Sequence, residues 1–156
     1  MLRIIADSTC DISKEDARKM GIQIVPISVR FGNEEFLDGV EITHEEFYTR
    51  LAECDELPKT SQPSPDTFMK VFNEAVAAGD DVLGIFISSD LSGTYQSACL
   101  AALDVEEETG KKLYMVDSRS ASIGTALLIR EAVKLRDAGV NAADIELLHL
   151  QEQCFI

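Results

Sequence analysis

The triplet Ser92-Gly93-Thr94 is the part of the sequence best suited to holding an anion. It opens a segment with helical character, so free backbone N–H groups and the positive end of the helix dipole would face a bound carboxylate or phosphate. Gly93 lets a ligand approach the backbone closely, while Ser92 and Thr94 add hydroxyl donors. The triplet therefore predicts an anion site that needs no Arg.

A second polar cluster is Pro58-Lys59-Thr60-Ser61-Gln62-Pro63-Ser64-Pro65. Its three prolines hold the segment extended and cannot donate hydrogen bonds, whereas Thr60, Ser61 and Gln62 can. On composition alone, the cluster is a stiff loop that presents several donors.

Three polar loops each follow a predicted buried strand: Asp7-Ser8-Thr9, Ser88-Ser89-Asp90 and Asp117-Ser118. In an open parallel sheet, ligands bind in the crevice at the carboxyl ends of the strands. Ser8, Ser89 and Ser118 are therefore further candidates for a hydroxyl-rich binding site. The alternative interpretation is that these polar residues only cap the helices that follow.

Short apolar strands alternate with helices along most of the chain. Strands are predicted at residues 2–6, 82–87 and 113–116, and helices at 13–20, 66–78, from the Ser92 triplet to about 107, 120–138 and 142–153. Strands that are apolar on both faces and separated by helices imply a parallel sheet covered on both sides. We therefore predict one α/β domain over residues 1–156, with a mainly parallel, Rossmann-like sheet and helices on both faces.

The segment after the first helix departs from that alternation. Residues 22–31 are strand-like but contain Pro26, which cannot donate to a ladder and places that part of the strand at an edge or a bulge. A tight turn then leads into a strand at 35–38. Thr43 begins a helix with Glu46 at the capping-box position, and its candidate buried residues are Phe47, Tyr48 and Leu51.

Composition excludes several classes of function. The 14 Lys and Arg against 28 Asp and Glu give a formal net charge of −14, which opposes binding to nucleic acid or to an anionic membrane surface. No stretch is long and apolar enough to be inserted in a membrane, and the start of the chain does not resemble a signal peptide. The cysteines at 10, 54, 99 and 154 form no CxxC pair. We expect reduced thiols, a cytoplasmic protein, and no metal or other cofactor.

Catalytic residues are not apparent. His44 and His149 are the only histidines, and both fall on predicted helices away from strand ends. No GxSxG nucleophile elbow is present. The alternative function is a phosphosugar-binding or isomerase-type domain that grips a phosphate at Ser92-Gly93-Thr94, because a helix start binds phosphate by the same chemistry.

Together these segments resemble the DegV family of fatty-acid-binding proteins. DSTCDIS, VPISVRF, PKTSQPSP, SSDLSGTYQSA and VDSRSASIG match that family in order and spacing over essentially the whole chain. The resemblance implies binding of one long-chain fatty acid, with Thr60 and Ser92 hydrogen-bonded to its carboxylate. Ser61, Gly93 and Thr94 would be close neighbours.

The resemblance also implies a carrier rather than an enzyme. Family members present the acyl group to a separate fatty-acid kinase, which makes an acyl phosphate for phospholipid synthesis. They continue into a second α/β domain that closes the ligand pocket, and nothing in this sequence corresponds to it. We expect the resulting open apolar surface to favour a homodimer.

Overall fold

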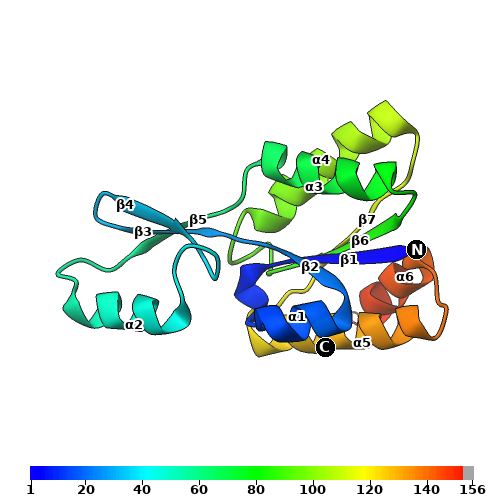
Figure 1. Ribbon diagram of the computed structural model, residues 1–156. Coiled ribbons are helices and arrows are strands. Elements are labelled where there is room, and N and C mark those ends of the chain that lie inside the picture. Colours follow the sequence, from blue (N-terminus) through cyan, green and yellow to red (C-terminus); the bar gives the residue numbers. More distant parts are fainter. Residues whose placement is uncertain (153–156) are drawn as a thin grey trace.

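A four-stranded parallel sheet forms the centre of the protein. The computed structural model describes residues 1–152, and the side chains of the last helix up to residue 148. The strand order is β2 (Ile22–Val25), β1 (Leu2–Asp7), β6 (Asp81–Phe86) and β7 (Tyr114–Asp117). All three pairings are parallel, as apolar strands separated by helices require. Figure 1 shows this sheet within the α/β core.

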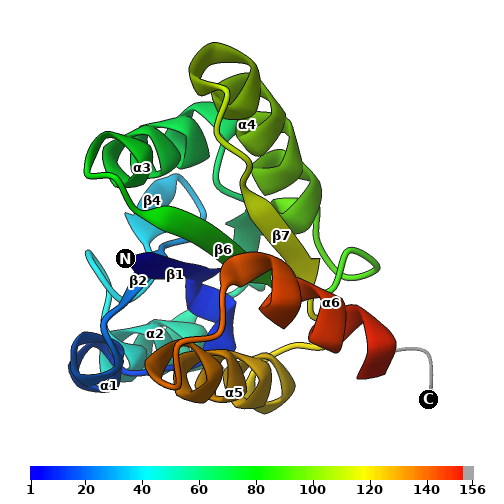
Figure 2. The ribbon, with the colours of Figure 1, turned by 90° about the vertical axis from the view of Figure 1, so that its right-hand side faces the viewer.

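Helices cover both faces of the sheet, which confirms the predicted fold class. Helices α1 (Lys14–Met20), α5 (Ile123–Asp137) and α6 (Ala142–Glu152) lie on one face, and α3 (Pro65–Ala77) and α4 (Thr94–Thr109) lie on the other (Figure 2). Each face of the sheet has its own hydrophobic core, and successive strand side chains point into opposite cores. Ile4 packs with the α5 side, whereas Ile5 packs with the Phe68 and Phe72 rings of α3. Both β1 residues are fully buried.

Residues 28–61 form an arm that extends away from this core (Figure 1). Its antiparallel sheet has the order β4 (Glu34–Leu37), β3 (Ser28–Phe31) and β5 (Lys59–Ser61), and α2 (His44–Glu53) packs beside it. The arm has a small core of its own around Val29, Phe31 and Ile42, with Phe36 and Phe47 partly buried against it. Pro26 lies where the chain leaves edge strand β2 of the large sheet and enters β3 of the small one, as its missing N–H predicts.

Two local predictions are confirmed and two are wrong. Ser13 and Thr43 cap α1 and α2, and Thr43 forms the predicted capping box with Glu46. The segment predicted to be a stiff loop contains a strand, because residues 59–61 pair with β3. Tyr48 is 67% exposed rather than buried, since α2 covers only a three-stranded ribbon.

Two of the residues considered in the sequence analysis lie near the end of the chain. Cys154 and the other residues from 153 lie outside the described part of the chain, as does the side chain of His149. No helix among the described residues has the length and apolar character required to span a membrane.

Candidate functional site

The two polar motifs meet at one cavity between the arm and the core. Although they are some 30 positions apart in the sequence, they face the same hollow of about 550 Å³. Its lining residues are Thr9, Ile27, Thr60, Ser61, Gln62, Ile87, Leu91, Ser92 and Gly93. The cavity thus brings together four of the five principal residues predicted from the sequence, and we call it the hydroxyl pocket.

Ser97 holds the Thr60 segment against α4. Its hydroxyl is buried and donates a 2.7 Å hydrogen bond to the carbonyl of Pro63, 34 residues earlier. Thr60 itself is fixed by pairing with Val29 in the ladder between β5 and β3. Ser64 then caps α3, so the chain leaves the pocket in a defined direction.

The Gln62 side chain lies directly over the Cα of Gly93. A Cβ built on Gly93 would lie 2.8 Å from Cδ of Gln62, well inside van der Waals contact. This contact shows that the two motifs approach each other closely at Gly93. It also places the amide of Gln62 at the mouth of the hydroxyl pocket.

Thr94 orients the hydroxyl of Ser92. The backbone N–H of Thr94 donates to Ser92 Oγ at 3.2 Å, and the two side-chain oxygens lie 2.9 Å apart. Ser92 Oγ accepts the Thr94 N–H, whereas either oxygen can be the donor in the hydroxyl pair. When Thr94 donates, the proton of Ser92 is available to a ligand in the pocket. Thr94 is fully buried behind Ser92 and supports it from outside the cavity lining.

Backbone donors complete this end of the pocket. Gly93 occupies the N-cap position of α4, where no side chain caps the helix. The N–H of Gly93 has no acceptor among the residues that the structure describes. A helix start with unsatisfied N–H groups favours an anion, as the sequence predicts.

Asp7 fixes the opposite wall of the pocket. Its fully buried carboxylate accepts hydrogen bonds from the Thr9 N–H at 2.9 Å, from the Thr9 hydroxyl, and from the Ile87 N–H at 2.9 Å. Both Thr9 and Ile87 line the hydroxyl pocket. Because Thr9 gives its proton to Asp7, it presents only acceptor lone pairs to a ligand. Donation to an anion therefore falls to Ser92, Thr60 and the backbone.

The three further serine candidates lie elsewhere. Ser8 accepts a bond from the Ile27 N–H at 3.2 Å and lines the adjoining hollow instead. Ser118 is buried, and its hydroxyl donates to the Ser120 carbonyl at 3.0 Å. Ser89 lies beside Asp117, whose carboxylate accepts its N–H at 3.2 Å. Neither Ser89 nor Ser118 lines the hydroxyl pocket.

Ser97 was missed from the sequence, and Asp7, Thr9 and Gln62 were noted only as parts of polar segments. The DST loop and the SGTYQSA run contained their polar side chains, but only three-dimensional contacts assign them roles. Ser97 is the clearest case, because a helical serine gives no sequence signal that its acceptor lies in another motif.

An apolar hollow continues from the hydroxyl pocket along the arm. It has a volume of about 580 Å³ and shares Thr9, Ile27 and Thr60 with the pocket. Beyond them its apolar part is lined by Val29 of β3 and by the aromatic rings of α2, Phe47 and Tyr48. The remaining lining is polar and consists of Ser8, Asp11, Asp38 and His44. A ligand with a polar head and an apolar body therefore fits the two hollows together.

The lining of the hydroxyl pocket is uncharged. No Lys or Arg lines the hydroxyl pocket. Burial raises the pKa of the nearby Cys10 thiol to about 11, so this thiol remains protonated and is a poor nucleophile at neutral pH. No cluster of His, Cys, Asp and Glu among the described side chains is arranged to hold a metal ion.

Sequence comparison identifies close relatives. The family model described as an uncharacterised protein of the DegV family matches residues 1–153. A DegV domain-containing protein of Clostridium perfringens is 40% identical over 145 residues, which make up 93% of this chain and 51% of that protein. The chain thus spans about half the length of the curated relatives it matches.

Solved structures agree in fold. A stearic acid-binding protein from Eubacterium ventriosum is 36% identical with a TM-score of 0.85, covering 93% of this chain and 50% of its own. A DegV family protein from Thermus thermophilus, described by its fatty acid binding, is 33% identical with a TM-score of 0.83, covering 96% and 52%. Both relatives are therefore known as fatty-acid binders.

Proposed function

We propose that this chain, which belongs to the DegV family, binds a long-chain fatty acid whose carboxylate lies between the hydroxyls of Thr60 and Ser92. The observation that carries the proposal is the hydroxyl pocket itself, where both motifs meet and open into an apolar hollow. Ser61 and Gly93 line the same pocket, and Thr94 orients Ser92.

The ligand's two parts match the two hollows. The carboxylate accepts hydrogen bonds from Ser92, Thr60 and the free N–H of Gly93, so it needs no cation from the described residues. The acyl chain follows Ile27 and Val29 toward Phe47. A sugar phosphate is the alternative ligand, since Ser8, Asp11, Asp38 and His44 line the same hollow and offer partners to its hydroxyls.

The chain acts as a carrier in this proposal, not as an enzyme. Thr60 and Ser61 are exposed at the pocket mouth, so a bound carboxylate would be accessible to a second protein. A fatty-acid kinase that phosphorylates this carboxylate is the proposed partner. The three described cysteines are free thiols, in keeping with the proposed cytoplasmic location.

Mass spectrometry of lipid extracted from the purified protein tests the ligand class directly. We expect a saturated or monounsaturated long-chain fatty acid at up to one equivalent. A phosphorylated sugar in the extract, with no fatty acid taken up on incubation, would refute the proposal.

A double-mutant cycle tests the residues. Ser92→Ala and Thr60→Val should each weaken binding of palmitate by about 1.5–3 kcal/mol, because each removes a hydrogen bond to a charged group. Since both hydroxyls share one carboxylate, the two losses should not add. Thr49→Val is the matched control, because its hydroxyl donates to the Glu45 carbonyl on the exposed side of α2. Strictly additive losses would mean that Thr60 and Ser92 contact different groups.

A further inference from the structure

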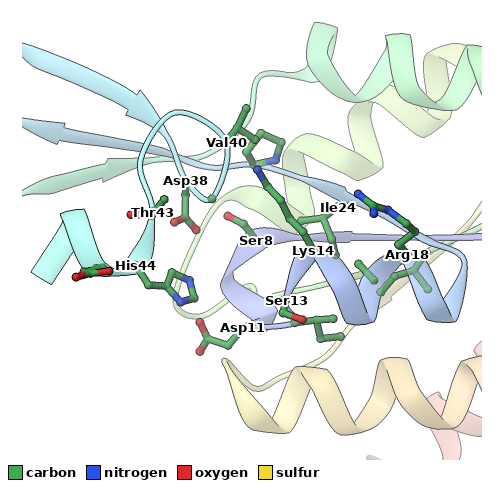
Figure 3. A pocket seen from close by; sticks show the side chains of 16 residues that line it. Ser8, Asp11, Ser13, Lys14, Arg18, Ile24, Asp38, Val40, Thr43 and His44 are labelled. Carbon is green, nitrogen blue, oxygen red and sulfur yellow. The ribbon is translucent and has the colours of Figure 1, made fainter.

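Another hollow lies beside the proposed fatty-acid pocket and meets its apolar hollow at Ser8, Asp11, Asp38 and His44. It has a volume of about 770 Å³ and runs between α1 and β2 on one side and residues 38–45 on the other (Figure 3). We call it the α1 groove. It shares no residue with the hydroxyl pocket. Its volume is in the range typical of sites for small organic ligands.

The floor of the groove is an apolar strip. Ile22, Ile24 and Pro26 lie along it, and Val40, which is 58% exposed, contributes the facing wall. The run from Ile22 to Pro26 covers about 13 Å at the usual rise of a strand. An alkyl or aromatic group of that length would remove this strip from water.

Two cations lie on the α1 side of the strip. Lys14 and Arg18 are four residues apart on α1, so their side chains share one face of the helix. In Figure 3 both side chains leave α1 on the side of Ile24. Neither side chain makes an ion pair or hydrogen bond with any described residue, although the chain carries 28 Asp and Glu. Two like charges at this spacing repel each other unless an anion lies between them.

The carboxylates of the groove lie at one end of it. Asp11 and Asp38 are grouped there with His44, away from Arg18 (Figure 3), and Glu45, the next residue of α2, also lines the groove. This separation would orient a ligand, because an anionic group is repelled from the Asp38 end and attracted to the α1 end.

We propose that the α1 groove binds an anionic amphiphile, with its carboxylate or phosphate head between Lys14 and Arg18 and its apolar part on Ile22, Ile24 and Pro26. None of these five residues lines the hydroxyl pocket or the apolar hollow, so the proposal does not depend on the function proposed for them.

Calorimetric titration of the whole chain with dodecyl phosphate, below its micelle concentration, tests the proposal. Lys14→Gln/Arg18→Gln should weaken binding at least about tenfold, since two charge-assisted contacts are lost. The matched control is Lys19→Gln/Lys70→Gln, which removes the same charge from exposed positions outside the groove. Val40→Asn should weaken dodecyl phosphate several-fold, whereas inorganic phosphate should bind far more weakly to every variant.

The outcomes separate cleanly. Equal affinity of the wild type and Lys14→Gln/Arg18→Gln overturns the proposal, as does an equal loss in the control, which would indicate only diffuse charge attraction. Loss of dodecyl phosphate binding in Ser92→Ala overturns it too, because the probe would then occupy the hydroxyl pocket. Dodecanoate distinguishes the two head groups: binding as tight as that of dodecyl phosphate identifies a fatty anion, and much weaker binding identifies a phosphate-bearing lipid.

Discussion

Replacing Ser97 by Ala should separate the positioning of the Thr60 segment from the chemistry of the ligand. The Ser97 hydroxyl is 3% exposed and donates its 2.7 Å bond to the equally buried Pro63. Its removal leaves a buried carbonyl without a donor, which costs about 1–3 kcal/mol of the free energy of unfolding. The better helix propensity of Ala returns up to about 0.5 kcal/mol. For a domain of this size, the melting temperature should fall by roughly 2–10 °C.

The effect on binding should depend on the head group. Without its tether the Thr60 segment is held by β3 and by the packing of Gln62 over Gly93, so palmitate affinity should fall by up to about tenfold. Hexadecanol, which lacks the carboxylate, should lose much less. We would measure both by displacement of a fluorescent fatty acid, alongside urea denaturation. Thr109→Ala is the control, because it removes a hydroxyl-to-carbonyl bond at the far end of α4, to Val105. Equal losses for palmitate and hexadecanol, or a stability loss without any change in palmitate affinity, would refute the positioning role.

Two other properties can be checked. Burial raises the pKa of Glu146, which accepts the N–H of edge residue Met115 at 3.2 Å. A carboxyl whose pKa is raised in the folded state stabilises the fold below its unfolded pKa, and this stabilisation is lost as the pH rises through the folded pKa. Glu146→Gln should therefore raise the melting temperature at pH 7 and not at pH 4. A gain at both pH values would mean that the charge of Glu146 is not responsible. The exposed side chains Tyr48, Leu57 and Leu91, at 67%, 81% and 67%, should support a homodimer, and light scattering that shows a folded monomer at every concentration would contradict this.

The sequence predicted the core better than the arm. The helix predicted at 66–78 is present as α3, and its periodic apolar residues, such as Phe68 and Phe72, specify a buried face wherever the helix packs. The arm depends on tertiary pairing instead. Nothing local in Lys59-Thr60-Ser61 favours a strand between prolines, and it becomes one because β3 offers an unpaired edge.

The candidate site shows the same division. Gly93 and Ser92 could be proposed from a helix start, because that chemistry is local. The link from Ser97 to Pro63 and the packing of Gln62 over Gly93 join residues about 30 positions apart, and no spacing rule predicts them. Asp7 was identified only as one polar residue of a loop, whereas its burial makes it the wall that orients Thr9.

The arm is connected to the core at only two places, residues 26–27 and 62–64, and a ligand held by both Thr60 and Ser92 adds a third connection. Ligand affinity and arm orientation are then thermodynamically coupled, and such coupling is reciprocal. A partner that binds α2 and rotates the arm would release the ligand without touching it, and the ligand would change that partner's affinity by the same factor. Unequal factors in the two titrations would rule out this two-body coupling. In that scheme the orientation of the arm controls ligand release, and a partner that binds α2 determines when the acyl chain is released.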